Sequence, residues 1–222
     1  YMYNEQNHDV FEPNFWQSPN NINLHGFFQS TFYFKEFDKQ IRKEFTLKDK
    51  FVNEALEFIN KLKKENNNKE IVSIHLRRGD LTDGTNDISN NYYGKDGKLS
   101  DDSICGNYLN KALSHFDDDK YIFLLFTGGS REGDDNKKDV SWLKDNLKGS
   151  NFFYSGIKTT LEDFALIKEC DHNIMSHSSS FGWWAAYLND NPNKKVIAPK
   201  DYSMEPDSWS REGFYPDNFT LI

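Results

Sequence analysis

The sequence predicts an α/β fold with a mostly parallel, doubly wound sheet. Short apolar runs alternate along the chain with longer segments whose apolar positions follow a helical period, as in repeated strand and helix units. Two of the apolar runs, residues 71–76 and 121–126, end abruptly in charged or glycine-rich turns, which suit the ligand-binding edge of such a sheet. The hydrophobic content is low, at 36%, but it includes many large aromatic residues, which make up 16% of the chain and can bury enough surface for a core.

The elements can be placed in order along the chain. Residues 1–37 are rich in aromatic residues, Asn and Pro without a helical period, so we expect loops and short irregular pieces there. A helical stripe over 49–64 leads into a strand at 70–76 and then a long Gly-rich and Asx-rich loop at 81–101. The remaining elements are expected to be a helix at 107–116, a strand at 121–126, a helix at 138–147, a strand at 151–155, a helix at 160–170, a very short strand at 174–175, a helix at 181–188 and a final strand at 195–198.

Composition argues against several classes of protein. The formal net charge of −8 disfavours a nucleic-acid partner, because a nucleic-acid backbone needs an extended basic surface. No segment in this chain reaches the roughly 20 apolar residues of a membrane span, and no signal peptide is evident. Cys105 and Cys170 are too few for a disulfide framework and lack metal-ligand spacing, so we expect reduced thiols.

A buried strand delivers His75, Arg77, Arg78 and Asp80 to a turn. The carboxyl end of a strand is where open α/β sheets hold ligands, and a guanidinium at that position suits phosphate. Since neighbouring residues at a strand end diverge, we expect only one of the two arginines to face a ligand. We therefore interpret this turn as the anion-binding edge of a nucleotide-sugar site.

Two further turns should face the same edge of the sheet. One holds Gly128 after the second apolar run, and the other holds Ser178, Ser179 and Ser180 immediately before a helix. Free amides, the helix dipole and hydroxyl donors at a helix start together form an anion site. These serines and Arg77 could therefore hold a diphosphate without a metal.

Each of these residues also has a structural interpretation. The serines could simply cap the helix, and either arginine could form a salt bridge, for instance to Asp163 or to the neighbouring aspartate. The tripeptide at 78–80 matches an RGD adhesion motif, although a strand end is a poor place for an exposed loop tip. We interpret His172 as a structural residue at a helix end, and we favour the core for Trp183 and Trp184 over a sugar-stacking role.

Three blocks of sequence, in this order, resemble the α-1,2-fucosyltransferase family of inverting, GDP-fucose-dependent enzymes. The block at 75–80 reads H-L-R-R-G-D, like the family's H-x-R-R-G-D element, and the block at 126–130 lies where the family has a second, looser strand-end block. The third block, at 162–188, resembles the family's D-F-x-L-x-x-C-x-H-x-I pattern and the S-x-x-W-x-A-x-L pattern that follows it. Residues 26–30, G-F-F-Q-S, are similar to the family's G-Y-F-Q-S, so the resemblance covers roughly 24–199.

The resemblance implies a GT-B-like fold in three parts. Residues 1–69 would be a remnant of the acceptor-side region with a linking helix, 70–200 the Rossmann-like GDP-fucose-binding domain, and 201–222 a tail packing back on the body. The family's glycine-rich G-N-Q-M-F element is not found, which leaves a fragment and a divergent member as alternatives. The compartment would be the cytoplasm for the chain as given, or the Golgi lumen if a membrane anchor has been removed.

The resemblance also implies a reaction and a set of residues. L-Fucose would pass from GDP-β-L-fucose to a sugar hydroxyl, with O-2 of a galactose in a glycan as the expected acceptor, with inversion and without a metal or other cofactor. Arg77 would contact the diphosphate and offset the charge of the leaving group, because a fixed guanidinium stabilises the developing charge. The predicted donor-binding set consists of His75 and Asp163 for the guanosine, with Arg78, Gly128, Ser178, Ser179, Ser180 and Phe181 around the phosphates.

The base that would take the proton from the acceptor hydroxyl is open at this stage. Asp80 is the nearest carboxylate by motif and is our choice for the catalytic set with Arg77, although an ion pair to an arginine is the alternative. His177 is a second candidate, and its alternative is a capping or core histidine. A non-catalytic module that binds a GDP-sugar or a glycan is the alternative function, and acceptor-dependent release of GDP would separate it from the enzyme.

Overall fold

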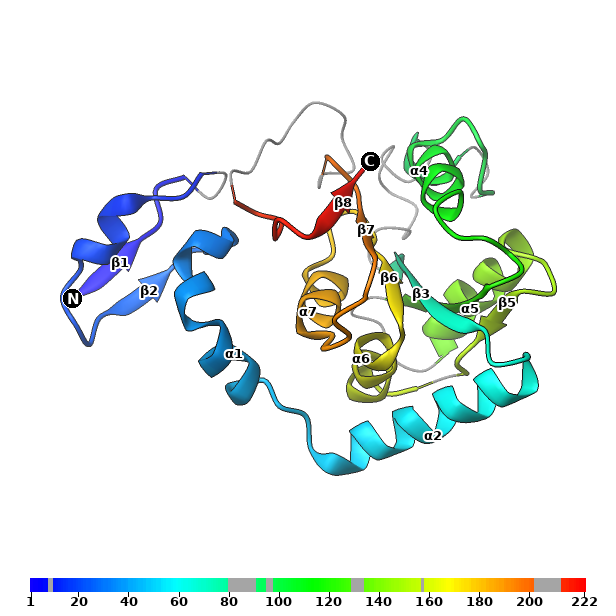
Figure 1. The fold of residues 1–222 in the computed structure, drawn as a ribbon. Coiled ribbons are helices and arrows are strands. Elements are labelled where there is room, and N and C mark those ends of the chain that lie inside the picture. Colours follow the sequence, from blue (N-terminus) through cyan, green and yellow to red (C-terminus); the bar gives the residue numbers. More distant parts are fainter. Residues whose placement is uncertain (8–9, 80–90, 95–97, 129–133, 157, 202–212) are drawn as a thin grey trace.

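The computed structural model describes residues 1–7, 10–79, 91–94, 98–128, 134–156, 158–201 and 213–222. Its body is a six-stranded sheet in which every described pair of neighbours is parallel (Figure 1). The strands, in order across the sheet, are β5 (Phe152–Tyr154), β4 (Tyr121–Gly128), β3 (Glu70–Arg77), β6 (His172–Ile174), β7 (Val196–Ala198) and β8 (Phe219–Leu221). The predicted α/β class with a mostly parallel sheet is confirmed.

Helices cover both faces of this sheet, because successive side chains of a strand point to opposite sides. The helices of the body are α2 (Asp49–Glu65), α4 (Ile104–Leu113), α5 (Asp134–Asn146), α6 (Thr160–Glu169) and α7 (Ser180–Leu188). Val72 and Ile74 of β3 are buried with residues of α4 and α5. Ile71 of the same strand is buried on the opposite face with α2, α6 and Ala185 of α7.

The chain winds in both directions from the middle of the sheet. It passes from β3 to β4 and β5 on one side, and then crosses back to β6, β7 and β8 on the other. The switch point therefore lies between the carboxyl ends of β3 and β6, and open α/β sheets bind ligands at such a point. The amide of Arg77 donates to Ser176 Oγ at 3.0 Å, which ties these two strand ends together.

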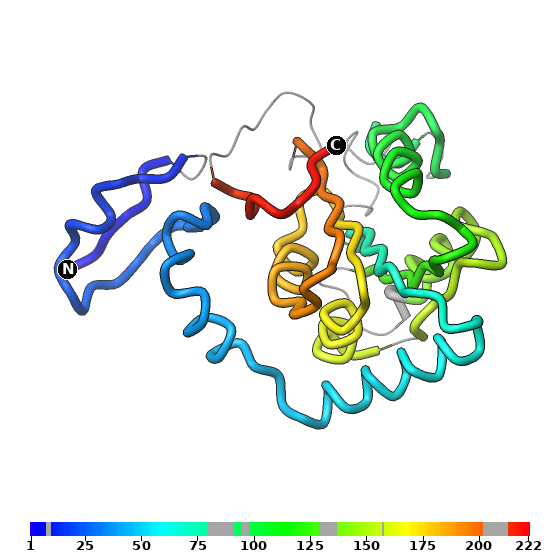
Figure 2. The backbone as a smooth tube through the Cα atoms, in the orientation of Figure 1, coloured from blue at the N-terminus to red at the C-terminus, as the bar shows by residue number. Residues whose placement is uncertain are grey.

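The N-terminal arm, residues 1–45, extends to one side of the sheet, and α2 returns the chain to β3 (Figures 1 and 2). Its elements are β1 (Met2–Asn4), η1 (Pro13–Gln17), β2 (Asn23–His25), η2 (Thr31–Tyr33), η3 (Lys35–Phe37) and α1 (Asp38–Glu44), with β1 and β2 paired in parallel. Phe15 and Phe28 each pack within 6 Å of Tyr33, ring centre to ring centre. The amide of Thr31 donates to the Gly213 carbonyl at 2.7 Å, which joins the arm to the chain just before β8.

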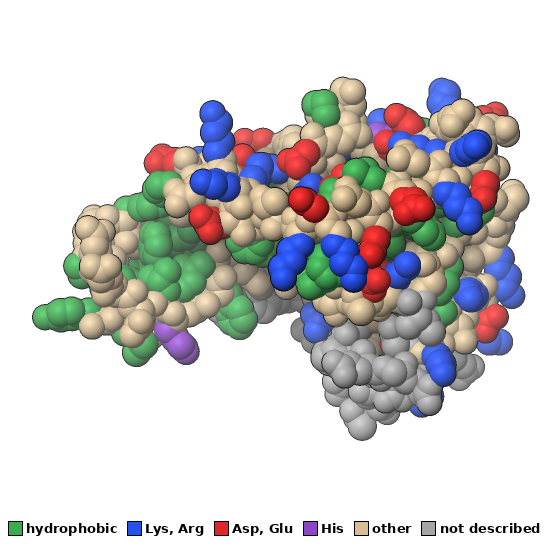
Figure 3. All heavy atoms as spheres, turned by 90° about the horizontal axis from the view of Figure 1, so that it is seen from below, with side chains coloured by type: hydrophobic (Ala, Val, Ile, Leu, Met, Phe, Trp, Pro, Cys, Tyr) green, Lys and Arg blue, Asp and Glu red, His purple; other side chains and the backbone are tan. Residues whose placement is uncertain are grey.

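The surface differs between the arm and the body. Apolar side chains gather on the arm, at the left of Figure 3, whereas acidic and basic side chains are interspersed over the rest of that face. Phe27, Trp16 and Leu24 are among the exposed apolar residues of the arm. No helix in the described part of the chain has both the length and the apolar character needed to cross a bilayer.

Most predicted elements are confirmed, and the differences have local causes. The last strand predicted from the sequence ends at residue 198, but β8 adds a parallel edge strand because Phe219 packs on Trp183 and the chain returns to β7. The predicted strand at 174–175 begins earlier, at His172, so this histidine lies in a strand and not at a helix end. Cys105 and Cys170 are free and buried.

Candidate functional site

Arg77 lies at the last position of β3, at the switch point of the sheet. Its guanidinium Nη1 donates to the backbone carbonyl of Ser178 at 2.5 Å, and its own carbonyl accepts from the Tyr93 hydroxyl. Ser178 has a positive φ of 49°, which turns the chain sharply before α7. The predicted meeting of the arginine and the serine-rich helix start is thus seen in the structure. This contact fixes one edge of the guanidinium.

Arg78 points to the opposite face of the sheet, as expected for the next residue along a strand end. Its Nε donates to Asp139 Oδ1 at 3.1 Å, and the amide of Gly79 donates to Asp139 Oδ2 at 3.1 Å. The guanidinium carbon also lies 3.8 Å from the ring centre of Trp142 and 4.8 Å from that of Tyr93. Arg78 therefore has the structural role that was its alternative, with Asp139 as the partner in place of Asp163, and we leave it out of the donor site.

The serines divide their roles around the start of α7. Ser179 is buried and caps the helix, since its Oγ accepts from the amide of Gly182 at 3.3 Å. Ser180 begins the helix and is exposed. The first backbone amides of a helix have no acceptor within the helix. In the described part of the chain, no group accepts a hydrogen bond from the backbone amide of Ser180 or of Phe181. Two amides and one hydroxyl are therefore available to an anion beside Arg77.

His75 lies beneath this helix start, on the same face of β3 as Arg77. Its Nδ1 is 3.4 Å from Ser179 Oγ, and its ring centre is 5.5 Å from that of Phe181. A Cβ at Gly182 would lie only 3.1 Å from His75 Nδ1, so glycine allows α7 to approach the imidazole closely. Burial, with the nearby Arg77 charge, lowers the pKa of His75 to about 4, and the ring is therefore neutral at pH 7.

Asp163 lies in the first turn of α6, which follows β5 and so begins at the same edge of the sheet. The Ser155 hydroxyl donates to its Oδ1 at 3.4 Å, and no ion pair to it occurs among the described residues. Burial raises the pKa of Asp163 to about 7. Its neighbour Phe164 packs on Phe181 at 5.3 Å between ring centres, which connects the α6 start to the α7 start.

Three predicted residues remain, namely Gly128, Asp80 and His177. Gly128 pairs with Arg77 across β3 and β4 and has a φ of 137°, a conformation that favours glycine. Asp80, our candidate base, lies outside the described residues. His177 is enclosed by aromatic rings, with Tyr92 Oη 2.9 Å from its Nδ1, and burial lowers its pKa to about 4, which matches its core alternative.

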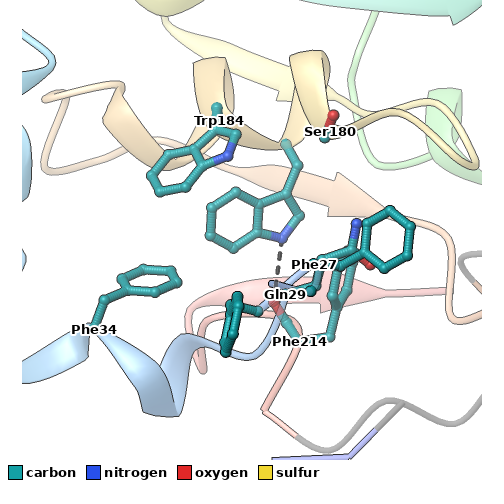
Figure 4. A pocket seen from close by; sticks show the side chains of 9 residues that line it. Phe27, Gln29, Phe34, Ser180, Trp184 and Phe214 are labelled. Atoms are coloured by element: carbon teal, nitrogen blue, oxygen red, sulfur yellow. Dashed lines mark hydrogen bonds between the residues drawn. The ribbon is translucent and has the colours of Figure 1, made fainter. Parts of the chain in front are cut away.

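A pocket of about 310 Å³ adjoins the start of α7 (Figure 4). It lies between the arm and the helix, and its lining includes Gln29, Phe34, Ser180, Trp183 and Trp184. Trp183 is buried as expected, and its Nε1 donates to the Phe214 carbonyl at 3.2 Å, so the ring is fixed. Both tryptophans face this pocket as well as the core. The apolar period of the helix could not show whether they pack in the core or line a pocket.

The residues that hold Arg77 and Arg78 in place are not evident from the sequence. Asp139 lies in a polar helix, and no feature of the sequence distinguishes it from the solvent-exposed aspartates nearby. Tyr92 and Tyr93 lie in a segment that we expected to be a loop. Gln29 lies in the G-F-F-Q-S segment, whose similarity to the family was a signal that it has a role. Among the described residues, no three His, Cys, Asp or Glu side chains come together as a metal-ligand set.

Known proteins resemble this chain over most of its length. A galactoside alpha-(1,2)-fucosyltransferase 1 from Aotus azarae is 31% identical over 176 residues, which are 75% of this chain and 43% of the relative. The Homo sapiens protein of the same name is 30% identical over 177 residues, with the same shares of the two chains. The chain thus spans about 43% of the length of these curated relatives. The model of glycosyl transferase family 11 matches residues 14–220, so the chain belongs to this family.

Proposed function

We propose that this protein binds GDP-β-L-fucose at the carboxyl edge of its sheet and transfers the fucosyl group to O-2 of a galactoside. The observation that carries the proposal is the meeting of Arg77 with the start of α7 at the switch point between β3 and β6. The relatives' name, galactoside alpha-(1,2)-fucosyltransferase, supports both the sugar transferred and the acceptor. Donor identity, inversion and independence of metal are parts of this proposal.

The diphosphate would lie between the Arg77 guanidinium and the α7 start. As the bond between the fucosyl C1 and the β-phosphate oxygen breaks, negative charge grows on the leaving GDP. A fixed guanidinium and the amides of Ser180 and Phe181 stabilise this charge more than the charge of the ground state, which lowers the barrier. The hydrogen bond to the Ser178 carbonyl holds the guanidinium in place before the donor arrives.

The guanosine would lie on the α6 side of the diphosphate. Ionised Asp163 can accept hydrogen bonds from the two N–H groups on the edge of guanine, and its burial makes such donors valuable. Neutral His75 can serve as a donor or an acceptor beside Phe181. These two residues give the site a preference for guanine over bases that present acceptors at that edge.

The acceptor hydroxyl would attack C1 from the face opposite to the departing phosphate and would lose its proton as the new bond forms. His177 is a poor base for this step, because it is buried among tyrosines and paired with Tyr92. Asp80 follows the H-L-R-R-G motif directly and remains our candidate for the base. Asp80→Asn would then lower kcat strongly and leave GDP affinity nearly unchanged.

Titration of GDP by calorimetry tests the proposal. Arg77→Ala should weaken GDP binding about 10- to 150-fold, because a hydrogen bond between a guanidinium and a phosphate contributes about 1.5–3 kcal/mol. Arg42→Ala is the matched control, since Arg42 contacts the Tyr187 carbonyl at the other end of α7. It should leave GDP affinity unchanged.

Two outcomes would contradict this assignment. Equal affinity of GDP for Arg77→Ala and the wild-type protein would remove Arg77 from the site. Tight GDP binding with no release of GDP from GDP-fucose when a galactoside is added would leave a binding module in place of the enzyme.

A further inference from the structure

We propose that the pocket between the N-terminal arm and α7 binds the pyranose ring of a neutral sugar. This inference rests on the proposed function, because the pocket begins at Ser180, where we place the diphosphate. Its volume of about 310 Å³ lies at the small end of the range of about 300–1,000 Å³ that is usual for small-molecule sites. That size suits a sugar ring better than a whole nucleotide.

The lining of the pocket matches the two kinds of surface of a pyranose. Trp184 stacks on Phe34 at 5.5 Å between ring centres, and Trp183 is held by its hydrogen bond to Phe214, so the aromatic walls are rigid (Figure 4). Aromatic faces pack on the C–H groups of a sugar at little entropic cost. The described residues that line the pocket include no Asp, Glu, Lys, Arg or His, which disfavours a phosphate and favours a neutral ligand.

Gln29 supplies the polar group that such a ligand needs. Its Oε1 is buried and has no hydrogen-bond partner in the described part of the chain. Buried polar atoms are nearly always paired, and one left without a donor costs stability. Gln29 lines the pocket, so a rotation of its amide toward the cavity would let this oxygen accept from a sugar hydroxyl, and the exposed Ser180 hydroxyl offers a second polar contact at the pocket edge.

The position of the pocket places it on the sugar side of the donor. Phe181 and Ala185 of α7 face α6, where the guanosine is proposed. Ser180, Trp183 and Trp184 face the arm and the pocket. The helix start, and with it the diphosphate, thus lies between the guanosine and the pocket. A ring in the pocket is either the fucosyl group of the donor or the terminal ring of the acceptor.

The variant Gln29→Met tests this role, because methionine has a similar shape but is only a weak acceptor. Calorimetry with GDP, GDP-fucose and methyl β-galactoside, the last with and without GDP, should show sugar binding weakened about 3- to 10-fold and GDP binding unchanged. The Tm of the free protein should rise, because an unpartnered buried oxygen is removed. Gln40→Met, at an exposed position of α1, is the control and should change neither ligand binding nor the Tm.

The separate titrations show whether the ring in the pocket comes from the donor or from the acceptor. If the fucosyl group occupies the pocket, wild-type protein binds GDP-fucose more tightly than GDP, and Gln29→Met loses that margin. If the acceptor ring occupies it, the galactoside titration weakens instead. Gln29→Met that binds every sugar as wild type does, or a wild-type protein for which the sugars add nothing, would overturn the proposal. Failure of GDP itself to bind would count against the proposed function, while the galactoside titration without GDP would still judge the pocket.

Discussion

The two faces of the sheet at the end of β3 treat the same side chain in opposite ways. Arg78 is buried with Asp139 and covered by two aromatic rings, so its charge is paired within the protein, although its Nη1 has no hydrogen-bond partner in the described part. Arg77, one residue earlier, reaches over the switch point to the start of α7. The strand pleat produces this difference, because successive side chains point to opposite faces. One of two adjacent arginines in a motif can therefore stabilise the fold while the other faces the ligand site.

The largest effect is expected on the Arg78 face, and it should be on stability. Arg78→Ala leaves Asp139 as a buried carboxylate without its cation, which typically costs about 3–5 kcal/mol. Chemical denaturation of Arg78→Ala measures this loss. The double variant with Asp139→Asn should recover part of it, because the uncompensated charge is then gone.

The two arginines should therefore separate in a paired experiment. Arg77→Ala loses GDP affinity with little loss of stability, whereas Arg78→Ala loses stability, and the folded fraction that remains still binds GDP. If Arg78→Ala were as stable as the wild-type protein and failed to bind GDP, the comparison would be wrong. The arginine on the packed face would then belong to the ligand site.

The carboxylates on the two faces also differ. Asp139 has a guanidinium partner, whereas Asp163 has none among the described residues, and burial raises its pKa to about 7. An aspartate with a raised folded-state pKa favours the folded state below its unfolded pKa of about 4. That contribution is lost as the pH rises from about 4 through about 7, where the folded-state carboxyl ionises.

Asp163→Asn should accordingly raise the Tm more at pH 8 than at pH 5. GDP affinity should show the opposite trend in the wild-type protein, because guanine donors prefer the ionised carboxylate, so binding should strengthen as the pH rises through about 7. Thermal scans and GDP titrations at both pH values check the two trends. A GDP affinity with the same pH dependence in Asp163→Asn would separate Asp163 from the guanosine.

The sequence predicted the sheet better than it predicted the two faces. Apolar runs and turn residues located β3, β4 and the helix at α7, and the motif located Arg77 and the serines at one edge. The pairing of Arg78 with Asp139 joins residues 61 positions apart, and local periodicity carries no information on such a contact. The N-terminal arm was hard to predict for the same reason, since its aromatic residues pair with residues distant in sequence, as Phe15 does with Tyr33 and Phe34 with Trp184 of α7.

The fold leaves polar groups unsatisfied on both faces of the sheet. Asp163 is half-buried without an ion pair in the described part, and Gln29 keeps an unpartnered amide oxygen. Across the sheet, Arg78 and Asp139 neutralise each other's charge, but Arg78 Nη1 is buried without a hydrogen-bond partner among the described residues. The faces differ in that the ligand-side carboxylate has no cation partner in the described part, and because proteins commonly violate their own packing rules at functional sites, this difference supports the same edge that the switch point indicates.

The smallest effect is expected where α7 approaches β3. Gly182→Ala improves helix propensity by about 1 kcal/mol, but its Cβ would lie 3.1 Å from His75 Nδ1, so the two effects largely cancel in stability. The imidazole must move by a few tenths of an ångström, and the contact that we propose between His75 and the guanosine should weaken, which we expect to lower GDP affinity only a few-fold. Denaturation and GDP titration of this variant measure both quantities. Because stability should stay nearly constant, an unchanged GDP affinity would show that His75 supports the helix start without touching the donor.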